Sequence, residues 1–134
     1  MTAPALAAAD LRSQRLARFR ASLPAHLERL TWDRDRIHAH QLQRLRALLR
    51  HAKARSPFHA ERLAAVDLDR FALDDLAGLP TMTKAGMMAS FDQVVTDPRL
   101  SRARVEAHLA ATTTEPAELL GEYIVLASGG SSGT

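Results

Sequence analysis

The stretch Glu122-Tyr123-Ile124-Val125-Leu126-Ala127-Ser128-Gly129-Gly130-Ser131-Ser132-Gly133-Thr134 guides the interpretation of the whole sequence. Its first part, Tyr123 to Ala127, is a short apolar run with β-branched and aromatic members between glycines, which predicts a buried strand. Its second part, Ser128 to Thr134, contains only glycine, serine and threonine. Such a loop can turn backbone N–H groups inward and add hydroxyl donors, so it indicates a phosphate-binding nest.

Other interpretations of the Ser/Gly segment stay open at this point. Segments of this composition also occur as flexible linkers, although a linker needs no apolar strand in front of it. The segment has no Gly-Lys-Ser/Thr, which excludes a Walker-type loop. Its glycine spacing also differs from that of the dinucleotide fingerprint.

The segment Ser128 to Gly133 resembles the phosphate loop of adenylate-forming enzymes, whose usual form is Ser-Ser/Gly-Gly-Ser/Thr-Thr/Ser-Gly followed by a basic residue. Thr134 stands in place of that basic residue. Three upstream segments are similar to the amino-terminal region of phenylacetate-CoA ligase-like proteins: Leu48-Leu49-Arg50-His51-Ala52, Ser56-Pro57-Phe58 and Leu76-Ala77-Gly78-Leu79-Pro80-Thr81-Met82-Thr83-Lys84. In that group a helix leads to a Pro-Phe/Tyr-Tyr element, where His59 replaces the last Tyr, and Leu-Pro-x-Thr-Lys opens another helix.

This resemblance implies the start of an α/β adenylate-forming domain that uses ATP and Mg²⁺, with coenzyme A as co-substrate and a small carboxylic acid as substrate. It assigns the ATP phosphates to Ser128, Gly129, Gly130, Ser131, Ser132, Gly133 and Thr134. It places the adenine pocket, the Mg²⁺-binding acid, the ribose-binding Asp and the catalytic Lys downstream of residue 134. We therefore expect no catalytic residue in this chain, and no activity from the 134 residues alone.

The composition is that of a soluble globular chain, with 46% hydrophobic and 25% charged residues. There is no cysteine, which excludes disulfides, thiolate metal sites and a cysteine nucleophile. No apolar run approaches the ~20 residues that span a bilayer. The sequence therefore predicts a cytoplasmic protein with no membrane partner.

Charge is divided unevenly along the chain. Residues 1–62 hold thirteen Lys and Arg against five Asp and Glu, whereas residues 63–134 hold five against ten. A basic half can bind nucleic acid. Its arginines alternate with leucines at helical spacing and no aromatic platform accompanies them, so we interpret them as a solvated helix face and expect no nucleic-acid partner. An Arg-rich helical binding module with a flexible Ser/Gly tail stays the alternative function.

Periodicity predicts a mainly α fold, with a helical region over residues 1–121 and a strand plus phosphate loop over 122–134. Helices are expected over residues 5–23, 41–54, 58–65, 84–91 and 101–111. Pro24 is expected to end the first helix or to open the next segment, and Ser56-Pro57 is expected to end the second helix. Thr83 is expected to cap the fourth. Shorter pieces are a helical turn over 73–80, an extended Val94-Val95 and a capped turn from Thr112 to Leu120.

Other candidate chemistry is weaker. His38 and His40 could bind a metal, but side chains two residues apart on a helix point to different faces. Ser128, Ser131 and Ser132 lack the Gly-x-Ser-x-Gly elbow of a nucleophile. We expect no metal site and no serine nucleophile.

Overall fold

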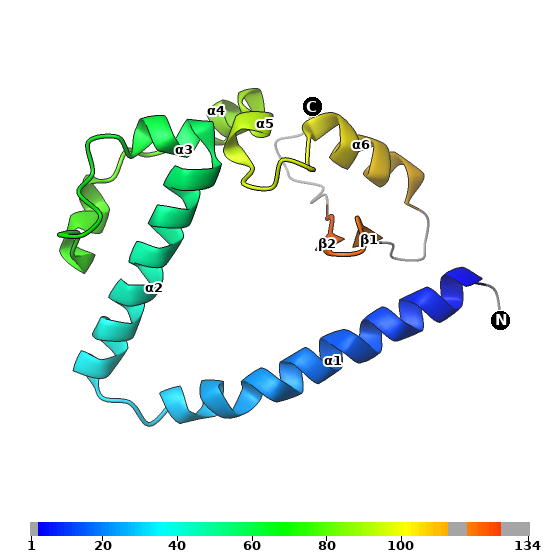
Figure 1. Ribbon diagram of the computed structural model, residues 1–134, viewed down its shortest axis with the longest axis horizontal. Coiled ribbons are helices and arrows are strands. Elements are labelled where there is room, and N and C mark those ends of the chain that lie inside the picture. The colour runs from blue at the N-terminus through cyan, green and yellow to red at the C-terminus, as the bar shows by residue number, and fades with distance from the viewer. Residues whose placement is uncertain (1–2, 113–117, 127–134) are drawn as a thin grey trace. The chain divides into compact units, whose positions relative to one another are not determined.

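The computed structural model describes residues 3–112 and 118–126, with side chains from Ser13 onward (Figure 1). The fold is mainly helical, as predicted. Its elements are α1 (Ala3–Arg29), α2 (Arg34–Arg55), α3 (Pro57–Arg62), the 3₁₀ helix η1 (Leu73–Gly78), α4 (Lys84–Ala89), α5 (Phe91–Val94), α6 (Arg102–Ala111), β1 (Glu118–Leu119) and β2 (Tyr123–Ile124).

Contacts divide the chain into two compact units. One unit comprises residues 31–102, and the other comprises residues 1–30 together with 103–134. The predicted boundary between Gly121 and Glu122 falls inside the latter and stays a prediction. Within the described part of the chain, no helix combines the length and the apolar character needed to cross a bilayer.

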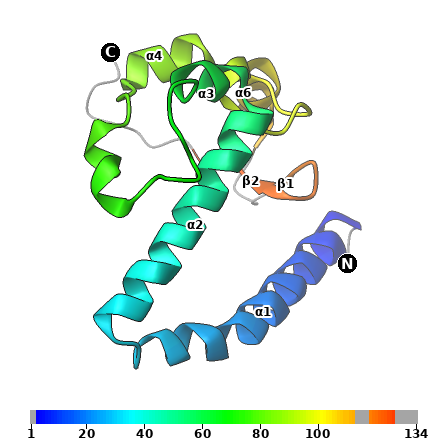
Figure 2. The same ribbon diagram turned by 60° about the vertical axis from the view of Figure 1, so that its left-hand side comes forward.

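Helix α2 is the longest element of the unit formed by residues 31–102, and α3 packs near its carboxyl end (Figure 2). The helix begins earlier than predicted because the Asp33 carboxylate accepts the N–H of Arg36 at 2.8 Å and caps the first turn. It ends at Ser56-Pro57, as predicted. Ser56 is both the C-cap of α2 and the N-cap of α3, and it is only 1% exposed.

The buried hydrophobic residues of this unit are Leu63, Leu68 and Phe71, in the segment that follows α3. Arg46 of α2 donates its Nε–H to the Phe71 carbonyl at 2.8 Å, which fastens that segment to the helix. Ser56 Oγ donates to the Gln93 carbonyl at 2.7 Å and accepts the His59 N–H at 3.2 Å. These hydrogen bonds join α2, α3 and the end of α5.

The region of residues 73–95 follows the predicted pattern with two differences. Helix α4 begins after Thr83, whose hydroxyl accepts the Gly86 N–H at 3.0 Å, so the predicted cap is confirmed. The predicted single helix is interrupted at Ser90 and continues as α5. The prediction of an extended segment over Val94-Val95 is wrong for Val94. Val94 is helical because its N–H donates to the Ser90 carbonyl.

In the other unit, the prediction that Pro24 ends the first helix is wrong, since α1 continues to Arg29. Proline removes one helical hydrogen bond but fixes φ near −65°, which is itself a helical value. The chain can therefore continue as a helix past Pro24 with one hydrogen bond fewer.

The turn predicted to run from Thr112 to Leu120 is replaced in part by a strand. Residues 113–117 lie outside the described part, but β1 pairs antiparallel with β2, with Glu118 opposite Ile124 and Leu119 opposite Tyr123. We expected the strand over Tyr123 to Ala127 to be buried. It has a partner, and Ile124 is 57% exposed. The hairpin forms because Leu120 and Gly121 adopt φ of 59° and 68°, which reverse the chain.

Candidate functional site

The sequence-predicted site, Ser128 to Thr134, lies outside the described residues, as does Ala127. The structure describes the segment that leads to it. Strand β2 ends at Ile124, Val125 is half-buried and Leu126 is 86% exposed. The order of a strand followed by the Ser/Gly segment therefore agrees with the prediction, while the strand is shorter than the five residues expected.

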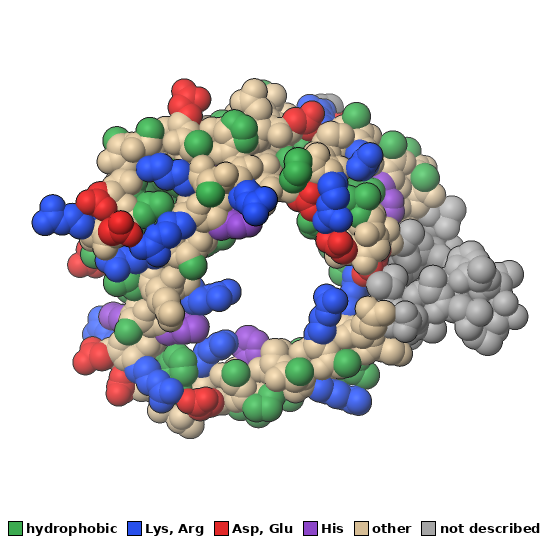
Figure 3. Space-filling view, viewed as in Figure 1, with side chains coloured by type: hydrophobic (Ala, Val, Ile, Leu, Met, Phe, Trp, Pro, Cys, Tyr) green, Lys and Arg blue, Asp and Glu red, His purple; other side chains and the backbone are tan. Residues whose placement is uncertain are grey.

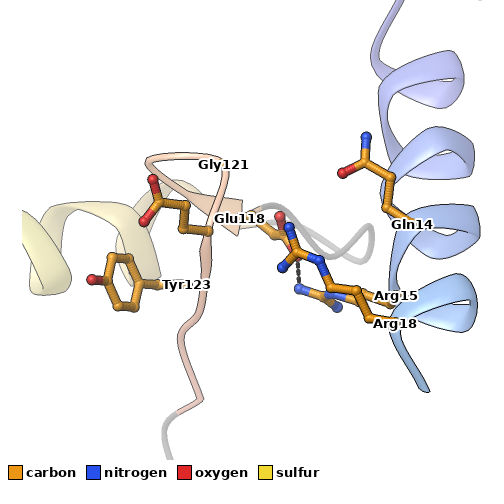
Figure 4. A pocket seen from close by; sticks show the side chains of 7 residues that line it. Gln14, Arg15, Arg18, Glu118, Gly121 and Tyr123 are labelled. Atoms are coloured by element: carbon orange, nitrogen blue, oxygen red, sulfur yellow. Dashed lines mark ion pairs between the residues drawn. The ribbon is translucent and has the colours of Figure 1, made fainter. Parts of the chain in front are cut away.

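A pocket of about 430 Å³ adjoins this hairpin. Its walls come from α1 and from the hairpin, and its lining residues are Gln14, Arg15, Arg18, Glu118, Gly121, Glu122 and Tyr123. Figure 4 shows the side chains of Arg15 and Arg18 extending from α1 toward the hairpin. Because these arginines are three residues apart on a helix, they lie on neighbouring positions of one face.

The charges in this pocket are of both signs. Arg15 forms an ion pair with Glu118, whose side chain is only 9% exposed, against 46% for that of Arg15 (Figure 4). Glu122 adds a second carboxylate and Arg18 a second guanidinium. The pocket can therefore form hydrogen bonds to a polar ligand, and its guanidinium groups are suited to oxyanions.

No local pattern in the sequence indicates this pocket. Arg15 and Glu118 are far apart in the chain, and helical periodicity assigned Arg15 and Arg18 only to a solvated face. The pairing of β1 with β2 also places Glu118 in the lining of the pocket, whereas the sequence predicted a capped turn at this position. A long-range pairing of this kind cannot be read from local patterns.

Of the two histidines considered as metal ligands, His40 packs against an aromatic ring. The His40 ring lies edge-on to Trp32 at 5.3 Å, and the Arg36 guanidinium lies 4.1 Å from the centre of the Trp32 ring. Trp32 thus packs against both side chains. Among the residues whose side chains are described, no three His, Asp or Glu lie close enough to hold a metal ion.

A second hollow, of about 460 Å³, lies in the unit formed by residues 31–102 and is partly acidic, with Asp67, Asp74 and Asp75 in its lining. Asp67 accepts the N–H groups of Asp69 and Arg70. Asp75 accepts the Ala72 N–H at 2.7 Å. Two of the three carboxylates therefore stabilise the local turns.

Comparison with known proteins finds no relative: no family model, no curated protein and no solved structure matches the chain.

Proposed function

We propose that the chain carries the amino-terminal portion of an ATP-dependent, carboxylate-activating enzyme of the adenylate-forming class. In this proposal Ser128 to Thr134 bind the β- and γ-phosphates of ATP. The observation that carries it is the Ser/Gly segment itself, placed directly after a strand-forming run.

The order of the upstream elements supports the same proposal. A helix, α2, leads to Ser56-Pro57-Phe58, and Leu79-Pro80 precedes a helix that opens at Thr83-Lys84. This is the order that the resemblance to phenylacetate-CoA ligase-like proteins implies. The pocket at Arg15 and Arg18 adjoins the hairpin whose second strand precedes the loop in the sequence, and its two guanidinium groups can donate hydrogen bonds to an oxyanion.

The reaction of such an enzyme proceeds in two steps. A carboxylate oxygen attacks the α-phosphorus of ATP, the bond to pyrophosphate breaks, and an acyl-adenylate forms. The thiol of coenzyme A then attacks the acyl carbon and AMP leaves. Throughout the first step, backbone N–H groups of the three glycines and hydroxyls of Ser128, Ser131, Ser132 and Thr134 would donate to the phosphate oxygens and hold the leaving pyrophosphate.

Mg²⁺ would offset the phosphate charge in such a reaction. Among the residues whose side chains the structure describes, no three carboxylate or imidazole groups converge. We therefore assign no step to Mg²⁺. We also assign no residue of this chain to binding of the substrate acid.

The test measures binding of inorganic tripolyphosphate and of ATP by calorimetry. Replacing both loop hydroxyls, Ser131→Ala with Ser132→Ala, should weaken tripolyphosphate binding by about tenfold or more, since each lost bond to a charged group costs about 1.5–3 kcal/mol. Ser90→Ala is the matched control, because the Ser90 side chain makes no capping hydrogen bond.

Two results would contradict the proposal or part of it. Binding that persists after deletion of Ser128 to Thr134 would favour the Arg-rich binding module instead. Robust ATP–pyrophosphate exchange with aryl acids on the 134-residue chain would show that the catalytic residues are not downstream.

A further inference from the structure

Helix α1 presents a stripe of large hydrophobic side chains to solvent. The apolar stripe consists of Leu16, Phe19, Leu23, Leu27 and Leu30, the last of which directly follows the helix. At 3.6 residues per turn these five positions fall within an arc of about 80°. Leu16, Phe19, Leu27 and Leu30 are 45%, 58%, 54% and 80% exposed, so the stripe has no partner within the described structure.

Basic residues surround the apolar stripe. Between Ser13 and Leu30 the basic side chains are Arg15, Arg18, Arg20, His26 and Arg29, and Glu28 is the only carboxylate. Figure 3 shows hydrophobic and basic side chains next to one another along α1. Arg20 and Arg15 lie on opposite sides of the stripe by helical spacing. A surface of this kind complements one that is apolar inside and negatively charged outside.

We propose that α1 lies on the surface of a membrane that contains anionic lipids, with the apolar stripe inserted among the lipids and the arginines at the headgroups. Helices with an apolar face and a basic polar face bind membranes in this way. Arginine stems can cover apolar surface while their guanidinium groups stay at the headgroups. This inference is independent of the proposed enzymatic function.

Two other occupants of the stripe are disfavoured by its length and charge. A coiled-coil partner requires about three to four heptads, whereas Leu16 to Leu30 covers two, with Pro24 inside the helix. A second copy of the chain would bring arginines against arginines. A bilayer surface needs no matching shape, and headgroup water can bond to the carbonyl that Pro24 leaves unpaired. The sequence had predicted no membrane partner from the lack of a spanning run, but a helix that lies on a bilayer needs none.

The test is flotation of the whole chain with lipid vesicles. We expect it to float with vesicles of equal parts phosphatidylcholine and phosphatidylserine, and not with pure phosphatidylcholine. Binding should fall as salt is raised, because headgroup attraction is screened. Failure to float with the anionic vesicles, or equal flotation with both kinds, overturns the proposal.

Paired variants distinguish vesicle binding through α1 from general charge attraction between the chain and the vesicles. Phe19→Ala with Leu27→Ala should weaken binding by about tenfold or more. Arg20→Gln with Arg29→Gln should weaken it by about fivefold per arginine. The matched controls on α2 are Leu48→Ala, at a side chain 63% exposed, and Arg44→Gln with Arg55→Gln; these should leave binding within about twofold of the parent.

Circular dichroism checks that each variant keeps its helix content. If the alanine variants lose helix, the arginine pair decides the result. Equal losses from the α1 and α2 arginine pairs would mean unspecific charge attraction and would overturn the proposal. A lipid-free dimer in sedimentation that the Phe19→Ala with Leu27→Ala variant abolishes would assign the stripe to a second copy, and would overturn it as well.

Discussion

The side chain of His59 lies half-buried on α3 beside Arg62. Burial lowers its pKa from the ordinary value of 6.5, and the positive charge of Arg62 lowers the pKa further. Arg62 Nη1 lies 3.3 Å from His59 Nδ1. Because guanidinium can only donate, Nδ1 is the acceptor and the neutral ring carries its proton on Nε2.

This lowered pKa predicts a pH dependence of stability. The unfolded chain takes up the His59 proton at a higher pH than the folded chain, so the free energy of unfolding is greatest above pH 6.5 and decreases as the pH falls below it. The change is complete once the pH is below the folded pKa. Urea denaturation at several pH values should show this decrease, and His59→Gln should make it smaller. His38→Gln, at an exposed position of α2, is the control; an equal reduction there would contradict the assignment to His59.

A second residue-scale prediction concerns Ser56, whose buried hydroxyl caps α3 and donates to the Gln93 carbonyl of α5. Ser56→Ala should lower the free energy of unfolding by about 2 kcal/mol, because it removes a helix cap and leaves the Gln93 carbonyl without its partner. Thermal denaturation measures the change. Ser90→Ala replaces an N-cap serine that makes no capping bond and should have little effect. Similar losses from both variants would show that the Ser56 hydrogen bonds contribute little.

At the scale of the elements, local hydrogen-bond chemistry decided which predictions were correct. The stop at Ser56-Pro57 and the Thr83 cap depend on groups a few residues apart, and both are confirmed. The prediction that a helix ends at Pro24 was wrong because proline weakens a helix but does not prevent it from continuing. Strand β1 was missed because its pairing is made with residues across a turn. The phosphate loop stays a prediction, and the pocket at Arg15 depended on contacts that no local pattern contains.

The β1–β2 hairpin turn gives an element-scale prediction. Leu120 has φ of 59°, a left-handed conformation that costs a side-chain-bearing residue about 1–2 kcal/mol, so Leu120→Gly should stabilise the hairpin by about 1 kcal/mol. Gly121→Ala should destabilise it, because Gly121 has φ of 68°. Amide exchange at Leu119 and Tyr123 reports both changes.

The matched control for the hairpin is Gly78→Ala at the end of η1. Gly78 has no left-handed φ, and an added Cβ there meets nothing within 4 Å. This variant should leave hairpin exchange unchanged. Faster hairpin exchange in Leu120→Gly than in the parent chain would show that the turn is not strained.

At the scale of the whole molecule, burial is uneven between the two compact units. Among the described residues, the buried hydrophobic side chains of the unit formed by residues 31–102 are those of Leu63, Leu68 and Phe71. The other unit buries the hydrophobic side chain of Leu119. Small domains with few buried residues have low stability.

This division predicts that residues 31–102 fold without the remainder of the chain. The fragment contains the buried cluster and the hydrogen bonds from Arg46 and Ser56. It should keep its helical circular dichroism, unfold cooperatively in urea and retain the pH dependence that His59 confers. A fragment that lacks helix, or that melts without a transition, would show that the other unit is required.

The shared cap at Ser56 also bears on how this chain can change in length. One residue ends α2 and begins α3, so no spacer exists between the two helices. Inserting one residue there would turn α3 by about 100° relative to α2 and withdraw the hydroxyl from Gln93. Insertions and deletions should therefore be excluded from this corner, while side-chain replacements nearby are accepted.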